Sequence, residues 1–345
     1  MNYHGYRYQG GRKTMNVSMW MQALRIIPKI SKEEWARLDV ISRWLISTRA
    51  AVLIMTFVSA TIAGILAIAA GQFNFWYYLL LVIGLVFAHA TNNLLNDLTD
   101  YDRGVDRDNY FRTQYGPQAL QSGLMTRREL LTYAAVTGLI ALVAGAILVF
   151  AHGWLALALL AAGAFFVLFY TWPLKYIGLG EIAVILVWGP LMIGGGYYVI
   201  TGQWDWNVAL AGLPYALGPT TVIFGKHIDK LREDKAKKIH TLPVILGETA
   251  SRYTVMAMIA LQYLLVVAPV ITGFFTPAML LVLLGLKGAP AVLKMLSQPK
   301  PETKPADDRT GWPMWFVSAV FVHNRGYGMF FLLGLILDTV IKLVF

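Results

Sequence analysis

Apolar residues occur in long uninterrupted runs along the chain, and short polar stretches separate these runs. Several runs reach about 20 residues, the length that an α-helix needs to cross roughly 30 Å of hydrocarbon. Strands of a membrane β-barrel would instead alternate polar and apolar residues over about ten positions. The pattern therefore predicts an all-α, polytopic membrane protein with nine transmembrane helices. The predicted spans are about 46–70, 75–94, 129–151, 153–171, 180–200, 207–225, 251–272, 275–296 and 326–344.

The segment before the first span is polar and basic, and it has no apolar core of the signal-peptide kind, so no cleaved signal peptide is expected. Ser31 and Glu34 have the spacing of a capping box, which predicts an interfacial amphipathic helix over SKEEWARLDVISRWL. This helix would present four apolar side chains on one side, namely Trp35, Leu38, Ile41 and Leu45. We therefore divide the chain into a basic N-terminal extension (1–42) and a nine-helix domain (43–345).

The apolar stretch 312–321 is too short to cross a bilayer. It is expected to lie in the membrane interface or to lengthen the last helix.

Composition and charge agree with a membrane location. Of 345 residues, 57% are hydrophobic and 14% charged, and the absence of cysteine excludes disulfides and thiolate metal sites. The net charge is +10, but Lys and Arg gather before the first span and in alternate loops, whereas the other four loops contain none. The positive-inside rule then places the amino terminus at the cytoplasmic side of the cell (inner) membrane and the carboxyl terminus outside. The basic charge is thus explained by topology, and no nucleic acid partner is expected.

Acidic residues follow the apolar run 75–90 directly, in the sequence NNLLNDLTDYDRGVDRD. A charged side chain at mid-bilayer costs roughly 2.5–3.5 kcal/mol on insertion scales, so acids near membrane depth require a compensating cation. Asn96 and Asp100 are four residues apart and share a helical face, with Asp97 beside them; Asp102 and Asp106 repeat this spacing if the helix continues. Oxygen ligands of this kind suit Mg²⁺.

A second acidic cluster follows the apolar run 207–225, in the sequence KHIDKLREDKAKKIH. Asp229 and Glu233 are four residues apart, and Asp234 comes next. Two acidic helix ends in similar positions indicate a doubled architecture in which the two sites face each other across a shared cavity.

Basic residues lie close behind both clusters, among them Arg103 after the first, and Lys226 and Lys230 around the second. Together with metal ions they would bind a polyanion such as diphosphate, although positive-inside topology alone also explains them. An apolar cavity with this mouth could hold a prenyl diphosphate, and aromatic rings could stabilise the allylic cation that forms when the C–O bond breaks. The candidates for this stabilisation are Tyr170, Trp172, Tyr176 and Trp188, which could equally belong to the interfacial aromatic belt.

NDLTDYDRGVD resembles the first aspartate motif of the UbiA superfamily of intramembrane prenyltransferases, in the form typical of the menaquinone-pathway branch. GPQALQSGLMTRREL, YTWPLKYIGLGE with WGP, and DKAKKIHTLPVILGE are similar to three further segments of that branch, so the resemblance covers about residues 45–345. It implies nine transmembrane helices around a central cavity, Mg²⁺ dependence, a polyprenyl diphosphate donor and a lipophilic or aromatic acceptor. By position it makes Asn96, Asp100 and Asp106 metal ligands and places Lys175 in a loop that helps to hold diphosphate.

The second motif departs from the family pattern D-x-x-x-D. If the second acid of the pattern is counted four residues from Asp229, it is Glu233. If the sequence is aligned with the family on the following DKA and TL, the second acid is Asp234. Asp234 is about 140° from Asp229 around a regular helix, so the helix would need a bulge to bring the two together. The glycine that often precedes TL is also missing, and Lys238 is near its position.

The resulting hypothesis is transfer of a polyprenyl group to 1,4-dihydroxy-2-naphthoate, with Asp100, Asp229 and Lys175 as catalytic residues. Glu181 is a candidate for removing the acceptor proton, or simply an acid at a helix start. The same fold could take another quinone precursor, a haem, a chlorophyllide, a phospholipid precursor or a sugar phosphate. Two other classes stay open: a transporter, for which Lys287 inside a span would be a feature, and a non-catalytic subunit of a larger complex.

Overall fold

The computed structural model describes residues 15–105, 116–306 and 311–345, and within them the chain is helical without strands. The helices are α1 (Val17–Arg25), α2 (Lys32–Arg37), α3 (Val40–Ser47), α4 (Ala50–Ala69), α5 (Phe75–Asp102), α7 (Arg127–His152), α8 (Trp154–Phe169), the 3₁₀ helix η1 (Leu174–Ile177), α9 (Gly180–Leu186), the π-helix η2 (Val187–Gly194), α10 (Gly195–Thr201), α11 (Trp206–Ala211), α12 (Leu213–Asp229), α13 (Leu231–Ala236), α14 (Leu242–Leu246), α15 (Glu248–Ile271), the 3₁₀ helix η3 (Pro277–Gly288), α16 (Ala289–Ser297) and α17 (Phe316–Val344).

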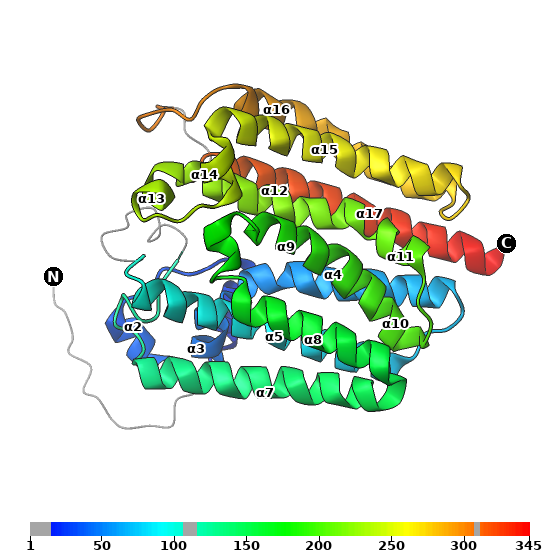
Figure 1. The fold of residues 1–345 in the computed structure, drawn as a ribbon, viewed down its shortest axis with the longest axis horizontal. Coiled ribbons are helices and arrows are strands. Elements are labelled where there is room, and N and C mark those ends of the chain that lie inside the picture. The colour runs from blue at the N-terminus through cyan, green and yellow to red at the C-terminus, as the bar shows by residue number, and fades with distance from the viewer. Residues whose placement is uncertain (1–14, 106–115, 307–310) are drawn as a thin grey trace.

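Eight helical segments in the described ranges are long and apolar enough to cross a membrane, and they coincide with eight of the nine predicted spans. The remaining one, α8, has 16 residues, or about 24 Å at 1.5 Å per residue, which is short for a hydrocarbon core of roughly 30 Å. Figure 1 shows α2 at one end of the bundle and the carboxyl terminus at the other, as an odd number of crossings requires. A multi-pass membrane protein is therefore established, while the count of nine spans stays a prediction.

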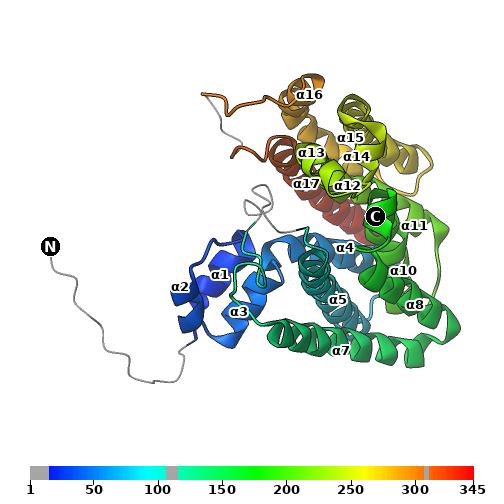
Figure 2. The same ribbon diagram turned by 60° about the vertical axis from the view of Figure 1, so that its left-hand side comes forward.

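The long helices lie roughly along one direction, and the two acidic helix ends are at the same end of the bundle (Figures 1 and 2). On one side α5 packs against α7, α4 and α8; on the other α12 packs against α15 and α17, and α17 against η3. The helix between these two groups, α9–η2–α10, contains Pro190, which cannot donate a backbone hydrogen bond, and the helix widens into a π-helix at this point.

The N-terminal segment differs from the single predicted helix. The capping box of Ser31 and Glu34 is present, but the helix ends at Arg37 and restarts at Val40, because Leu38 and Asp39 are extended. Of the four apolar side chains expected on one side, Trp35, Leu38 and Leu45 are buried, while Ile41 is 46% exposed. The expectation of one continuous amphipathic helix is therefore wrong.

Asp39 causes this break. Its carboxylate accepts hydrogen bonds from the backbone N–H of Ser42 at 2.9 Å and from the indole of Trp20 on α1 at 3.1 Å, so it caps α3 and ties α1 to it. The buried residues of this N-terminal segment form one hydrophobic cluster with α4, α5 and α7. The segment thus packs on the bundle, and its placement in the membrane interface stays a prediction.

The last helix begins at Phe316, so residues 316–321 of the stretch 312–321 lengthen it, as one of the two predictions for this stretch expected, and residues 312–315 precede the helix. The second predicted span also proves longer than expected, since α5 continues to Asp102 and carries the first acidic segment on its last turns.

Candidate functional site

The first acidic segment belongs to the C-terminal turns of α5, where Asp97 and Asp100 are 2% and 4% exposed. Asp97 forms an ion pair with the guanidinium of Arg49, which comes from the N-cap of α4. Arg49 has φ +55, a left-handed conformation that costs a non-glycine residue roughly 1–2 kcal/mol. Such strain is typical of residues held in place for function.

Asp100 has a different partner, since its carboxylate accepts a hydrogen bond from Lys175 Nζ at 2.7 Å. Lys175 lies on η1 and is 4% exposed, and its backbone N–H donates to the carbonyl of Tyr170 at the end of α8. A Cβ at Gly180 would lie 3.3 Å from Lys175 Cα, so the glycine lets the start of α9 pack tightly against η1. Asp100 and Lys175, which come from two different sequence motifs, thus lie together in the structure.

Arg103 follows directly after α5 and faces two aromatic rings of the η1 region. Its guanidinium lies 4.6 Å from the ring centre of Trp172 and 5.2 Å from that of Tyr176. Two of the four predicted cation-stabilising aromatics therefore contact a resident cation. Asp106, the third acid of the first motif, lies outside the described residues.

The second acidic segment is split by a break in the helix. α12 ends at Asp229, α13 begins at Leu231, and Lys230 between them leaves the helical conformation. The carboxylate of Asp229 accepts hydrogen bonds from the backbone N–H groups of Phe316 and Val317, at 3.0 and 2.9 Å. Asp229 therefore caps the N-terminus of α17, whose positive dipole end favours a carboxylate.

Gly225, one turn before Asp229, makes this contact geometrically possible. A Cβ there would lie 3.0 Å from the backbone nitrogen of Val317, so only glycine lets α12 and the start of α17 approach this closely. Lys300 adds a charge to the same place: its Nζ donates to the Asp229 carbonyl at 2.7 Å and lies 3.7 Å from Asp229 Oδ1. Burial lowers the pKa of the Lys300 ammonium, and the negative charges of Asp229 and Glu233 oppose this shift.

Asp234 pairs with the lysine one turn before it, and Lys230 Nζ lies 2.8 Å from Asp234 Oδ1. Both residues are buried, at 8% and 2% exposure, whereas Glu233 and Lys226 are half-buried. The helix breaks at Lys230, as an approach of Asp234 to Asp229 would require, and the two acids have different partners, Lys230 and the start of α17. The assignment of a metal-binding role to Asp229, Glu233 or Asp234 stays a prediction.

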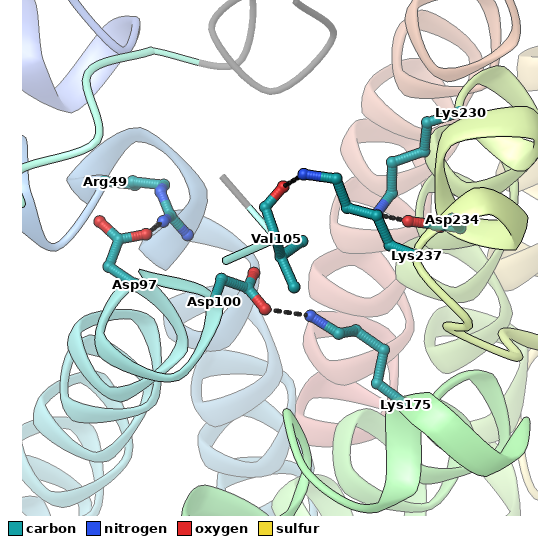
Figure 3. Close-up of polar contacts among 8 residues, drawn as sticks. All are labelled: Arg49, Asp97, Asp100, Val105, Lys175, Lys230, Asp234 and Lys237. Atoms are coloured by element: carbon teal, nitrogen blue, oxygen red, sulfur yellow. Dashed lines mark hydrogen bonds and ion pairs between the residues drawn. The ribbon is translucent and has the colours of Figure 1, made fainter. Parts of the chain in front are cut away.

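Lys237 joins the two acidic segments. Its Nζ donates to the carbonyl oxygens of Gly104 and Val105 just beyond α5, at 3.0 and 2.6 Å. Figure 3 shows this bridge between the Asp100–Lys175 pair and the Lys230–Asp234 pair. The two segments, about 130 positions apart in sequence, therefore meet at one end of the bundle.

Glu181 at the start of α9 is buried and lies 2.5 Å from Nδ1 of His227, which precedes Asp229 by two residues. Its other oxygen accepts a hydrogen bond from the backbone of Leu242 at 3.3 Å. The pair connects three segments of the site, so a structural role for Glu181 is evident, and its role as a proton acceptor stays a prediction.

A cavity of about 320 Å³ lies next to this site, among α5, α7, α8, α9, η2 and α10. Its walls are mostly leucine, alanine and glycine, and its few polar members include His89, Asn92 and Tyr170. Trp188 also lines it, packed edge-on against His89 with ring centres 5.4 Å apart. Tyr170 belongs to both regions, because it lines the cavity and its backbone carbonyl accepts a hydrogen bond at 2.9 Å from the N–H of Lys175, the partner of Asp100.

The chemistry of the donor set decides where a divalent cation fits. At the first segment Asn96 and Asp100 present oxygen ligands from one helical face, with Asp106 as a further ligand predicted from the sequence. At the second segment Asp234 Oδ1 is paired with Lys230 and Asp229 caps α17, just as Asp100 at the first segment is paired with Lys175. In the three described ranges, no group of three or more His, Cys, Asp or Glu side chains could hold a metal ion.

Sequence reasoning missed three members of the site: Arg49, Lys237 in its bridging role, and His227. The sequence did contain a signal for Arg49, because a basic residue at the start of an apolar run needs a partner for its charge. Lys237 and His227 lie in a polar stretch among other charged residues, so nothing local in the sequence marks them.

Comparison with known proteins agrees with these observations. The profile described as "UbiA prenyltransferase family" matches residues 57–316. The chain is 32% identical over 225 residues to a 1,4-dihydroxy-2-naphthoate octaprenyltransferase of Mycobacterium tuberculosis, which covers 64% of this chain and 73% of that protein. It is 24% identical to the enzyme of the same name from Bacillus subtilis, over 69% of this chain and 76% of that protein.

Solved structures show the same fold at low sequence identity. The apo structure of a UbiA homologue from Aeropyrum pernix superposes with a TM-score of 0.63 at 19% identity, over 83% of this chain and 98% of the other. A UbiA homologue from Archaeoglobus fulgidus bound to GPP and Mg²⁺ superposes with a TM-score of 0.58 at 17% identity, over 85% and 99%.

Proposed function

Because this chain belongs to the UbiA prenyltransferase family and is a transferase by that membership, we propose that it transfers a polyprenyl group from a polyprenyl diphosphate to 1,4-dihydroxy-2-naphthoate. The observation that carries the proposal is the position of Tyr170, at the boundary between the apolar cavity and the charged cluster around Asp100. A donor with an apolar chain and a diphosphate head matches these two adjoining environments. The acceptor is the one named for the relatives from Mycobacterium tuberculosis and Bacillus subtilis.

The charged cluster would hold the diphosphate head. Lys175 supplies positive charge at Asp100, and Arg103, which follows α5, lies on the ring of Tyr176 that also faces the Lys175 ammonium. When the allylic C–O bond breaks, both bonding electrons go to the diphosphate oxygen, and cations already in position stabilise the departing charge more than the intact substrate. Lys175 is buried and fixed by its pair with Asp100, so it needs no reorganisation to do this.

Mg²⁺ would be held by Asn96 and Asp100, with Asp106 as the third predicted ligand. Bound there, it would neutralise charge on the diphosphate as that group leaves. Solved UbiA homologues with GPP and with DMAPP contain Mg²⁺, which supports this assignment.

The cavity would shield the reaction from water. Its apolar walls suit the prenyl chain, and the rings of Tyr170 and Trp188 are positioned on its lining to contact an allylic cation. The transporter hypothesis loses its basis with membership in a transferase family. Other acceptors remain the alternative, since one matched relative is named 2-carboxy-1,4-naphthoquinone phytyltransferase.

The test incubates the purified protein with Mg²⁺, a labelled geranylgeranyl or longer polyprenyl diphosphate, and a panel of acceptors. We expect a prenylated naphthoate, identified by mass, only when Mg²⁺ and 1,4-dihydroxy-2-naphthoate are both present. A product formed with a different acceptor would overturn the assignment of the acceptor. Absence of any transfer by folded protein would favour the non-catalytic subunit.

A further inference from the structure

The second acidic segment carries a cation of its own. If Asp234 is the second acid of the family pattern D-x-x-x-D, the first acid of the pattern would lie four residues earlier, at position 230. This chain has Lys230 at that position, so the alignment that selects Asp234 rather than Glu233 places a lysine where the pattern has an acid. Lys238, three residues before Thr241, supports this alignment: its φ is +57, the left-handed conformation that glycine adopts most easily and that the missing family glycine would provide.

The pair is built into the fold. Lys230 Nζ lies 2.8 Å from Asp234 Oδ1, and both side chains are almost fully buried. Asp234 is fixed in turn by its backbone carbonyl, which accepts a hydrogen bond from Ile239 at 2.9 Å. Asp229, the other buried acid of this segment, accepts hydrogen bonds from the backbone at the start of α17 instead.

A divalent cation and an ammonium group compete for the same carboxylate. Two like charges within about 4 Å repel strongly at low dielectric, so a metal ion at Asp234 would have to displace Lys230 from its buried position. A metal ion at Asp100 would likewise meet Lys175. The residue one turn before Asp100, however, is Asn96, an oxygen ligand, whereas the residue one turn before Asp234 is Lys230 itself. An ammonium has three donors, and the one used by Asp234 leaves two for phosphate oxygens. Lys230 is thus both the neutralising charge of Asp234 and a phosphate-binding group.

We propose that the Lys230 ammonium takes the place of a divalent cation at the second acidic segment, so that a metal ion binds at the first segment alone. The proposal rests on the proposed function, because it specifies how the diphosphate head is held. The second half of the site then contributes charge through Lys230, oriented by Asp234, while Asn96 and Asp100 serve the metal.

The test counts bound metal directly. Full-length protein in detergent is dialysed against Mn²⁺ with a non-hydrolysable thio-analogue of geranylgeranyl diphosphate, and bound Mn²⁺ is measured by electron paramagnetic resonance. We expect one Mn²⁺ per chain in the native protein and two in Lys230→Asp, which restores an acid pair at i, i+4. Lys235→Asp is the matched control, because it makes the same charge change five residues further on, at an exposed position of α13, and should leave the count at one.

A second variant keeps the test decisive if Lys230→Asp does not fold. Lys230→Gln combined with Asp234→Asn replaces the ion pair by neutral groups of similar shape, and we expect it to retain one Mn²⁺ while binding the analogue at least about tenfold more weakly. Two Mn²⁺ per native chain, or loss of the single Mn²⁺ in the double variant, would overturn the proposal. If either of these results is found in protein that still transfers the prenyl group, the proposed function stands and only the proposal about Lys230 fails. If the native protein binds one Mn²⁺ per chain but transfers no prenyl group, the proposed function fails and the proposal about Lys230 is not contradicted.

Discussion

Asp100 and Asp102 lie two residues apart on α5 and have different surroundings. Asp100 is buried against Lys175, whereas Asp102 is exposed and pairs with the exposed Arg127 at 2.7 Å. Asp100→Asn should lower the rate of prenyl transfer by about 100-fold or more, because one anionic ligand is lost and Lys175 loses its partner. Asp102→Asn should change the rate less than about twofold. Initial rates at saturating Mg²⁺ measure both, with thermal midpoints to confirm folding.

Equal rates in the two variants would contradict the assignment of Asp100 to the site. A loss that extra Mg²⁺ restores would indicate that Asp100 contributes affinity for the metal more than catalysis.

Asp229 allows two roles with different consequences. As the cap of α17 it satisfies two backbone N–H groups, and Asp229→Ala should destabilise the fold by about 1–2 kcal/mol, seen as a thermal midpoint lower by several degrees in detergent. As a metal ligand it would instead reduce the amount of bound Mn²⁺ at temperatures where the variant is folded. From its geometry we expect the first result, with the Mn²⁺ count unchanged.

The individual residues of the site were only partly predictable. Asn96, Asp97 and Asp100 stand out because acids follow an apolar run directly, and this signal is local. Their partners Arg49 and Lys175 come from positions 48 and 75 residues away in sequence, as the ion pairs show, and only folding brings them together. The sequence shows that Lys230 lies four residues before Asp234, but only the fold shows that the two side chains are in contact.

Among the elements, the N-terminal segment shows how one polar residue decides between one helix and two. The apolar spacing of Trp35, Leu38 and Leu45 fits a continuous helix, and periodicity alone favoured it. Asp39 instead favours two separate helices, because its carboxylate accepts hydrogen bonds from the backbone of Ser42 in the first turn of α3 and from Trp20 on α1. The bond from Ser42 is a helix cap, which requires that Asp39 be extended and that the helix be interrupted there. The acidic ends of α5 and α12 were predicted correctly because their apolar runs are long and lead directly into them.

This segment should be sensitive to acid. Burial opposes ionisation of Asp39, but hydrogen bonds from Ser42, Trp20 and Asn16 outweigh it and lower the pKa of its carboxyl to about 2. The stabilisation is therefore complete above the unfolded pKa of about 3.9 and is lost as the pH falls toward about 2. Limited proteolysis of the N-terminal segment between pH 3 and pH 6 should show cleavage rising at the acid end.

Asp39→Asn provides the comparison. It should be cleaved faster than the native protein at pH 6, and the difference should shrink as the pH falls. A difference that is the same at pH 3 and pH 6 would contradict the role of the Asp39 charge.

For the whole molecule, continuous apolar runs were enough to predict the helical membrane fold, since a bilayer leaves few ways to satisfy the backbone. They were not enough to define the cavity, whose lining comes from six elements and depends on side-chain packing. Hydropathy alone also did not predict the length of α8. The apolar run is nearly long enough to span the hydrocarbon core, but the helix ends at Phe169, and the chain then turns through η1, which carries Lys175.

Orientation in the membrane follows from the distribution of positive charge, and the chain suits a direct test because it contains no cysteine. Single cysteines at Lys235 on α13 and at Gln203, in the loop between α10 and α11, lie at exposed positions on opposite ends of an apolar helix. The positive-inside rule predicts that Gln203→Cys reacts with a membrane-impermeant maleimide in intact bacterial spheroplasts, and Lys235→Cys only after lysis. The reverse pattern would place both acidic segments outside. Labelling of both sites in intact cells would mean that the segment between them does not cross the membrane. The predicted count of nine spans would then be wrong, because it includes this segment.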